Sequence, residues 1–202
     1  MKTGKNPMYR MPVFFGPATG PRRGPTGEPF DGTKGFDTIT QTISLLGDPK
    51  QLQEFLPPNF ELYGDPIFNV HFKYMKNIEW LAGRGYNLAG VNIHAVHKGA
   101  KETPGTLLLV LWENMNEPIL SGREELGYSK VYCELPDYQE VQGTCYCKAS
   151  WDGFRFMELT TNNSRDPSDE DNKGVAARTA GLMGNLHYKY IPGHRRLGQS
   201  GH

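Results

Sequence analysis

The alternation of hydrophobic and polar residues along this chain predicts a protein built mainly of strands. In the segment 68–74, two phenylalanines, a valine and a tyrosine share one face, while Asn69, His71 and Lys73 share the other. A period of two is typical of a half-buried strand, because successive side chains of a strand point to opposite faces. The same reasoning predicts strands over 39–46, 90–97, 141–150, 154–161 and 185–191. The segment 106–114 is apolar enough to be a strand that is covered on both faces.

Short helices and tight turns are predicted between these strands. Asp48 followed by Pro49 is typical of a helix start, because aspartate accepts from free backbone N–H groups and proline fits the first helical position. Asp152-Gly153 between two predicted strands indicates a tight hairpin. Helices are predicted over 48–56, 119–127 and 173–183. The fold class that follows is α+β, mainly antiparallel β, with a barrel- or sandwich-like arrangement and a few short helices.

The 202 residues fit one domain flanked by two less regular ends. Residues 1–37 are rich in glycine and proline and are interpreted as an extended N-terminal arm. Residues 38–192 hold the predicted strands and helices and form the β domain. Residues 193–202 carry no strand or helix signal and are predicted to be an unstructured tail.

Composition narrows the classes of function. The 22 basic and 22 acidic side chains cancel, so no overall field favours nucleic acid or an anionic membrane. No segment reaches the run of about 18 apolar residues that a membrane-spanning helix needs, and no apolar core of a secretory signal follows Met1. Three cysteines, an odd and low number, suit a reducing compartment. We therefore expect a cytoplasmic protein that binds neither nucleic acid nor membrane.

The sequence indicates no metal site. The two histidines of the segment 90–97 are three residues apart on a predicted strand and so face opposite sides. Cys145 and Cys147 share a face, but two thiols without a second pair favour core packing over zinc binding. The acidic segment 169–180 imitates a calcium loop but has a lysine and an alanine at ligand positions, so we interpret it as a solvated loop.

The segment 116–130 stands apart because it follows the most apolar predicted strand and mixes an apolar turn with charges and glycines. Its composition alone suggests an exposed helical turn in which Arg123, Glu124 and Lys130 are solvated. Its three motifs are Asn116-Glu117-Pro118, Gly122-Arg123-Glu124 and Gly127-Tyr128-x-Lys130. In this order they resemble the signature of the acetoacetate decarboxylase superfamily.

Flanking features agree with this resemblance. The strand, helix and Pro-Pro element at 39–58, the alternating strand at 67–75 and the Gly-x-Gly-Tyr stretch at 83–86 occur in the order expected of that superfamily. The resemblance thus extends over residues 12–192, although only the segment 116–130 is specific.

The resemblance implies that Lys130 forms a Schiff base. A neutral lysine amine attacks a ketone and gives an iminium, which withdraws electrons from the neighbouring carbon. A β-keto acid then loses CO2, or the enamine of a small keto acid adds to an aldehyde co-substrate. Either path needs a neutral amine near pH 7, whereas the ordinary pKa of lysine is about 10.4. An apolar pocket or a neighbouring cation supplies that shift, and neither a metal nor an organic cofactor is implied.

The sequence departs from the family pattern around this lysine. Val131 stands where the decarboxylases have a second lysine, and Ser129 where they usually have proline. The active-site acid of the family aligns with Leu88, and a further acidic position aligns with Lys73. The substrate-binding arginine of the family has no secure match, since the arginines at 22–23 are displaced.

These departures suggest roles for the surrounding side chains. Leu88, Val131 and Tyr128 are expected to desolvate the lysine and so favour its neutral form. Lys73 either points inward, where it would bind the substrate carboxylate, or faces solvent. Tyr86 is either a proton donor or a core residue.

A second group of side chains matches the motif without a direct chemical part. We expect Glu117, Arg123 and Glu124 to orient the turn that carries Lys130.

We therefore predict a Schiff-base-forming lyase that acts on a small keto acid through Lys130, by decarboxylation or by pyruvate aldol condensation and dehydration. The loss of the decarboxylase carboxylates fits the second reaction. The alternative is a non-catalytic barrel that binds a small molecule and retains the lysine. The Gly/Pro-rich arm and the resemblance both favour a homo-oligomer, and the resemblance implies further strands beyond residue 192.

Overall fold

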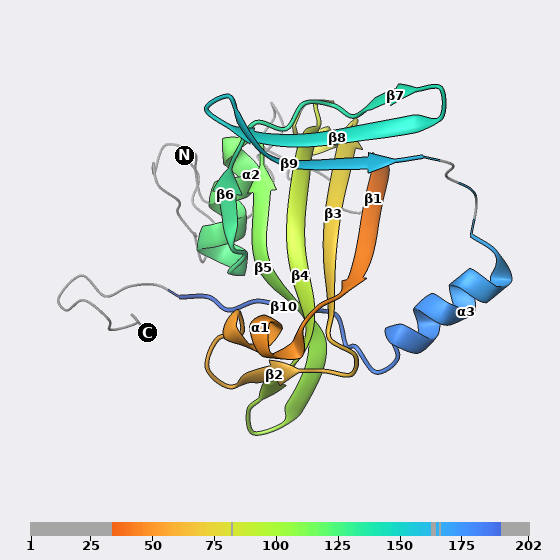
Figure 1. Ribbon diagram of the computed structural model, residues 1–202. Helices are drawn as coiled ribbons and strands as arrows, with labels where there is room; N and C mark the ends of the chain where they lie inside the picture. Colours follow the sequence, from red (N-terminus) through yellow and green to blue (C-terminus); the bar gives the residue numbers. More distant parts are fainter. Residues whose placement is uncertain (1–33, 82, 163–164, 166, 191–202) are drawn as a thin grey trace, which may run out of the picture.

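Two sheets dominate the computed structural model, which describes residues 34–81, 83–162, 165 and 167–190 (Figure 1). The larger sheet has the strand order β1-β3-β4-β5, with β2 beside β4 and both β6 and β10 along the outer edge of β5. Its strands are β1 (Asp37–Leu46), β2 (Phe60–Leu62), β3 (Ile67–Lys76), β4 (Tyr86–Lys98), β5 (Glu102–Glu113), β6 (Lys130–Tyr132) and β10 (Asn185–Leu186). The pairs β1–β3, β3–β4 and β4–β5 are antiparallel, whereas β6 and β10 run parallel to β5.

The smaller sheet crosses one end of the larger one (Figure 1). It contains β7 (Gln139–Val141), β8 (Thr144–Trp151) and β9 (Phe154–Thr161), all antiparallel. Its buried face packs on Phe72, Tyr74 and Ala89 of the larger sheet, and Cys145 and Cys147 fill the core between the two sheets. The mainly antiparallel fold with few helices is confirmed as a sandwich-like arrangement. The barrel alternative is wrong for the described residues, because their sheets do not close.

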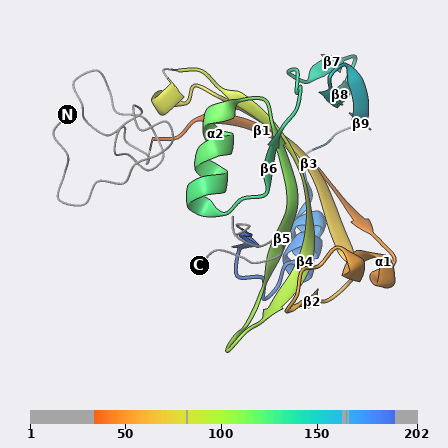
Figure 2. The same cartoon turned by 90° about the vertical axis from the view of Figure 1, so that its left-hand side faces the viewer.

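The helices are short and peripheral. They are α1 (Pro49–Glu54), a single 3-10 turn (Glu79–Leu81), α2 (Asn116–Ser121), a π-helical turn (Gly122–Leu126) and α3 (Asp169–Arg178). Figure 2 shows α2 and the three-stranded sheet on opposite faces of the larger sheet. Among the described residues, no helix is long and apolar enough to cross a membrane.

Local signals explain where several elements begin. The Asp48 carboxylate accepts hydrogen bonds from the backbone N–H groups of Lys50 and Gln51 at 2.9 and 3.0 Å, and Pro49 opens α1, as predicted. Asp152 and Gly153 both have positive φ, of 47° and 76°, which the predicted tight hairpin requires.

Two predictions about the second half of the chain are wrong. The acidic segment after Ser168 is the first turn of α3, because Ser168 and Asp171 form a reciprocal capping box. Within the described part of the strand predicted over 185–191, only Asn185–Leu186 form a strand, and these two residues pair with β5.

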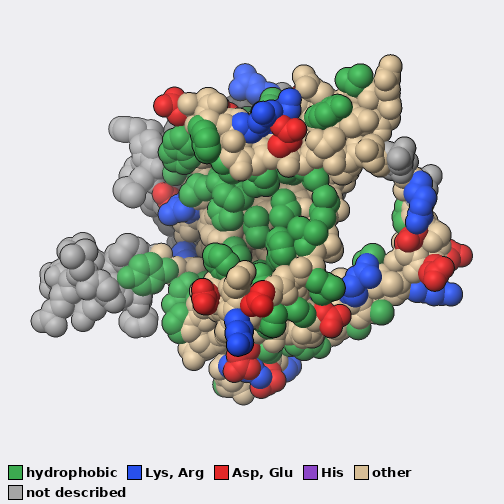
Figure 3. Space-filling model, viewed as in Figure 1, with side chains coloured by type: hydrophobic (Ala, Val, Ile, Leu, Met, Phe, Trp, Pro, Cys, Tyr) green, Lys and Arg blue, Asp and Glu red, His purple; other side chains and the backbone are tan. Residues whose placement is uncertain are grey.

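The larger sheet is only partly covered on the face that carries the smaller sheet. Figure 3 shows a hollow of hydrophobic side chains between the smaller sheet and the region of α1 and β2. The register places Ile43, Val70, Val91 and Val110 in one row across this face, and all four are half-buried. The β5 segment predicted to be covered on both faces is therefore partly open on this one.

The expected ends of the chain fall mainly outside the described residues. The arm predicted over 1–37 is described only from residue 34, and the tail predicted over 193–202 is not described. The domain boundaries of the sequence analysis therefore stay predictions.

Candidate active site

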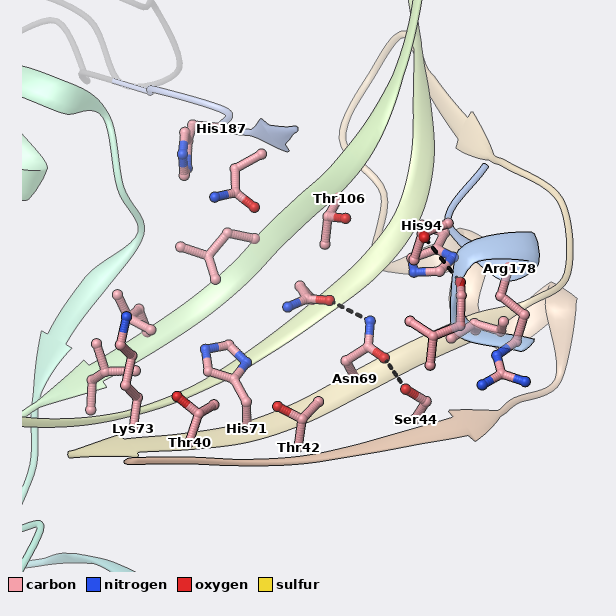
Figure 4. Close-up of a pocket in the computed structure, with 18 of the residues that line it drawn as sticks. Thr40, Thr42, Ser44, Asn69, His71, Lys73, His94, Thr106, Arg178 and His187 are labelled. Carbon is pink, nitrogen blue, oxygen red and sulfur yellow. Dashed lines mark hydrogen bonds between the residues drawn. The ribbon is translucent and has the colours of Figure 1, made fainter. Parts of the chain in front are cut away.

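The other face of the larger sheet forms the wall of a pocket of ≈ 570 Å³ (Figure 4). Alternate residues of four neighbouring strands point into it, as the period of two requires. They are Thr40, Thr42 and Ser44 of β1, Ile67, Asn69, His71 and Lys73 of β3, Leu88, Asn92 and His94 of β4, and Thr106, Leu108 and Leu111 of β5. Tyr128, Asn185, His187 and one side of α3 complete the lining.

Lys130 reaches this face because the chain leaves β5, passes through α2 and a π-helical turn, and returns as β6 parallel to β5. Gly127 ends the turn with φ +80°, a left-handed conformation that glycine adopts without strain. The register pairs Lys130 with Leu111, so both side chains lie on the pocket side of the sheet. Lys130 is 8% exposed and is not among the lining residues, but its neighbours Leu111 and Tyr128 are.

The Lys130 ammonium lies against a buried carboxylate. Its Nζ is 2.8 Å from Glu113 Oε1 and donates a hydrogen bond of 3.0 Å to the Pro118 carbonyl. Glu113 is 0% exposed, and apart from this ion pair neither of its carboxylate oxygens has a partner among the described residues. Burial raises the pKa of Glu113, and the nearby Lys130 opposes this only in part. A buried carboxyl that holds its proton more tightly than usual is a suitable acceptor for a proton from the amine beside it.

Aromatic rings surround this ion pair. Nζ of Lys130 lies 5.1 Å from the centre of the Tyr128 ring, which in turn packs on His187 with ring centres 4.0 Å apart. Burial and, to a smaller extent, Glu113 and Tyr128 raise the pKa of Tyr86. The structure thus brings Tyr86, Tyr128, Glu113 and Lys130 into one cluster, in which Tyr86 is neutral at ordinary pH.

Lys73 and Leu88 lie in one row with Glu113 across three strands. Leu88 is the register partner of Lys73 on one side and of Glu113 on the other. Both Lys73 and Leu88 line the pocket, which is the inward orientation considered for Lys73. Lys73 also lies 5.8 Å from the centre of the Phe36 ring.

The remaining motif residues contact the turn and not the pocket. Arg123 donates a hydrogen bond of 2.7 Å to the Lys130 carbonyl and so ties β6 to the π-helical turn. The Glu124 carbonyl accepts a hydrogen bond of 2.7 Å from Lys189, while Glu117 is half-buried in the first turn of α2. No group of three potential metal ligands occurs among the described side chains.

The sequence analysis missed Glu113 and the polar wall of the pocket. Glu113 is the last residue of the most apolar strand. A charged residue directly after an apolar run was the signal in the sequence that could have indicated a functional carboxylate. The register of β4 on β5 shifts between Val91 and Asn92, so Leu108 faces the pocket before this bulge and Leu111 faces it after. Glu113, two residues beyond Leu111, lies on the same face of the strand. Simple alternation along β5 would have placed Glu113 on the opposite face.

The pocket histidines give a pH dependence of stability. Burial lowers the pKa of His94, and His94 is 5% exposed. A lowered folded-state pKa means that the unfolded chain binds the proton more readily, so stability is present above the unfolded pKa of about 6.5 and is lost as pH falls below it. We expect His94→Gln to reduce the slope of unfolding free energy against pH between pH 7 and 5, by up to about 1.4 kcal/mol per pH unit.

Urea unfolding of both proteins at several pH values measures this slope. At pH 8 the histidine is neutral in both states, so the difference there gives the packing cost of the substitution alone. Equal slopes in wild type and His94→Gln would contradict the prediction.

Comparison with known proteins identifies the family of this chain. The family model described as acetoacetate decarboxylase (ADC) matches residues 10–200, and the chain belongs to this family. No match to a curated protein sequence was found.

Solved structures show the same fold at low identity. Acetoacetate decarboxylase from Legionella pneumophila matches with a TM-score of 0.60 at 20% identity, over 77% of this chain and 58% of that one. The acetoacetate decarboxylase-like enzyme from Sphingomonas wittichii RW1 matches with a TM-score of 0.61 at 16% identity, over 78% and 65%. This chain therefore spans less than two thirds of the length of these relatives.

A third relative is matched over more of its length. The enduracididine biosynthesis enzyme MppR, in its complex with the condensation product of pyruvate and imidazole 4-carboxaldehyde, has a TM-score of 0.61 at 16% identity, over 96% of this chain and 75% of that one. The same enzyme has been solved with pyruvate bound.

Proposed function

We propose that this protein is a Schiff-base-forming lyase in which Lys130 attacks the ketone of a small keto acid, with pyruvate aldol condensation and dehydration as the reaction. The observation that carries the proposal is the buried pair of Lys130 and Glu113, 2.8 Å apart, beside a pocket of ≈ 570 Å³. A charged lysine is no nucleophile, and a surface lysine in water stays charged. In this site the buried carboxylate of Glu113 lies close enough to Lys130 to accept that proton.

The first step is a proton transfer followed by a loss of water. Nζ passes a proton to Glu113 Oε1, which leaves a neutral amine and a neutral carboxylic acid. The amine adds to the carbonyl carbon to give a carbinolamine, and Glu113 returns its proton to the departing hydroxyl. One ammonium and one ketone thus become one iminium and one water, with no net gain or loss of protons.

The iminium then determines the reaction. The Glu113 carboxylate removes a proton from the carbon next to the iminium, and the resulting enamine adds through that carbon to an aldehyde. The new alkoxide takes that proton back from Glu113. Loss of the hydroxyl together with a proton from the neighbouring carbon then releases one water across the new bond, and addition of one water to the iminium frees the product and the lysine. Decarboxylation would start from the same iminium on a β-keto acid, with the bond to the carboxylate breaking instead.

Two features favour condensation over decarboxylation. Leu88 and Lys73 occupy positions that are acidic in the decarboxylases, and both line the pocket. Lys73 can hold the carboxylate of the keto acid at one end of the row in which Glu113 lies. Condensation is also the reaction that the complex of MppR with its pyruvate-derived product represents.

Reductive trapping tests the proposal. We expect incubation with pyruvate and borohydride to add the mass of one reduced pyruvate to the intact protein, and peptide mapping to place it on Lys130. Lys130→Met keeps the length of the side chain without the amine and should show no adduct. Lys189→Met is the matched control, because it removes an exposed lysine that contacts the same turn and should leave the adduct intact.

The outcomes separate the two function classes. An adduct that persists in Lys130→Met would overturn the assignment of the lysine. Pyruvate that binds by calorimetry without forming an adduct would support the non-catalytic binding protein. Where the adduct forms, product analysis decides the reaction, since CO2 release from acetoacetate without condensation of pyruvate and an aldehyde would make the protein a decarboxylase.

A further inference from the structure

Among the described residues, the lining of the pocket carries positive charge and no negative charge. It includes the two cations Lys73 and Arg178 but no aspartate or glutamate. Because the chain as a whole has no net charge, this surplus is a property of the site. Glu113 does not offset it, since that carboxylate lies against Lys130 behind the lining residues.

The two cations are available to a ligand. Neither Lys73 nor Arg178 has a carboxylate partner within the part of the chain that the structure describes. Other exposed cations do have one: Lys76 lies 2.6 Å from Asp137, and Arg165 lies 2.6 Å from Asp171. Two cations that line a pocket and lack such partners fit a ligand that brings its own negative charges.

Lys73 and Arg178 stand at opposite ends of the pocket (Figure 4). Lys73 lies in the row of Thr40, Leu88 and Glu113, and Glu113 at the other end of this row pairs with Lys130. Arg178, on α3, lies beyond the row of Ser44 and Asn69. Residues on one face of a strand repeat about every 6.6 Å, so the rows of Lys73 and Asn69 are about 13 Å apart.

Uncharged polar groups line the space between the two ends. Ser44 donates a hydrogen bond of 2.6 Å to Asn69, whose amide donates one of 2.7 Å to Asn92. Burial, together with Lys73, lowers the pKa of His71, and burial lowers that of His94, so both imidazoles are neutral near pH 7. This middle section therefore offers hydrogen bonds to an extended chain without adding a charge.

We propose that the pocket takes a keto acid with a second acid group at its far end, and that Arg178 binds that second carboxylate. This inference rests on the proposed function, since the keto group must lie at Lys130. Lys73 pairs with the carboxylate next to the ketone, and the guanidinium at the other end pairs with the terminal one. Arginine suits this part because its planar group binds a carboxylate through two parallel hydrogen bonds.

A pair of eight-carbon substrates tests the second carboxylate. The probes are 2-oxosuberate and 2-oxooctanoate, which differ only in a terminal carboxylate or methyl group. The rate of borohydride-trapped adduct against substrate concentration gives an apparent affinity for each. We expect the dicarboxylate to bind about 10-fold more tightly, which corresponds to about 1.4 kcal/mol, close to the lower end of the range for a hydrogen bond to a charged group.

Variants of α3 assign the effect to one side chain. Arg178→Gln should remove the preference for 2-oxosuberate and leave the affinity for 2-oxooctanoate unchanged. Lys173→Gln removes the same charge from the same helix outside the pocket and should keep the preference. Equal affinities in the wild type, or a preference that survives in Arg178→Gln, would overturn the proposal.

The experiment also distinguishes this proposal from the proposed function. If neither substrate forms an adduct, Lys130 is not a Schiff-base lysine and the proposed function fails. Calorimetry of the same two ligands then still measures the preference and its dependence on Arg178. If both substrates form adducts with equal affinity, the proposed function stands and the second carboxylate site does not exist.

Discussion

Replacing Glu113 with glutamine is expected to slow Schiff-base formation by about 10²- to 10⁴-fold at neutral pH, the range that a general base contributes. The amide keeps the size of the carboxyl group but cannot accept the proton of the Lys130 ammonium, whose Nζ lies 2.8 Å from Oε1. Initial rates of borohydride-trapped adduct with saturating pyruvate measure the effect.

A pH profile separates this role from a purely structural one. Without Glu113 the lysine must lose its proton to water, so the rate of Glu113→Gln should rise steeply with pH and approach that of the wild type in alkaline solution. Glu102→Gln, at the exposed start of the same strand, should behave as wild type. A Glu113→Gln rate that stays low at every pH would contradict the role of Glu113 as the acceptor of the lysine proton.

Gly122→Ala is expected to reduce adduct formation by about 100-fold while the protein stays folded. A Cβ at this position would lie 2.6 Å from Cδ and Cε of Lys130 and 2.8 Å from its Nζ, so the lysine must leave its place beside Glu113. A displacement of about 1 Å from the reacting geometry can cost a factor of this size. The backbone does not oppose the change, because Gly122 has helical angles of −64° and −42°.

Gly174→Ala in α3 is the matched control for this substitution. The new Cβ would meet only the Arg178 side chain, at an ordinary 3.6 Å, and alanine is favoured over glycine within a helix by about 1 kcal/mol. Circular dichroism of both variants establishes folding, and trapping rates then compare the sites. A Gly122→Ala protein with the wild-type rate would contradict the placement of Lys130 against Gly122.

Local patterns were enough to predict most strands. The two faces assigned to 68–74 are those of β3, because a period of two follows from strand geometry alone. The start of α1 was predictable because Asp48 and Pro49 act within one turn. The start of α2 at Asn116 was not, since its preceding residue Met115 makes no side-chain cap. The strand predicted over 185–191 was too long, because its length depends on how many of its residues pair with β5 and a local pattern does not encode that pairing.

Only the part of the site that lies within one local segment could be predicted from the sequence. Lys130, Tyr128 and Arg123 belong to one short segment and could be recognised by their spacing. Glu113 meets Lys130 only because β6 returns parallel to β5, a contact between separate elements that no local pattern encodes. Arg178 reaches the pocket through the placement of α3, whose second half falls within the helix predicted over 173–183 but whose start and position beside the pocket the sequence did not predict.

The bulge between β4 and β5 has a consequence for comparing this chain with its relatives. Thr106 and Leu108 line the pocket at even positions, whereas Leu111 lines it at an odd one and Glu113 lies on the same face as Leu111. A relative without the bulge, aligned residue by residue through this strand, would have its inward and outward side chains exchanged on one side of residue 109. A gap in such an alignment therefore belongs inside β5. The number of residues between Thr106 and Glu113 decides which side chains of this strand face the pocket.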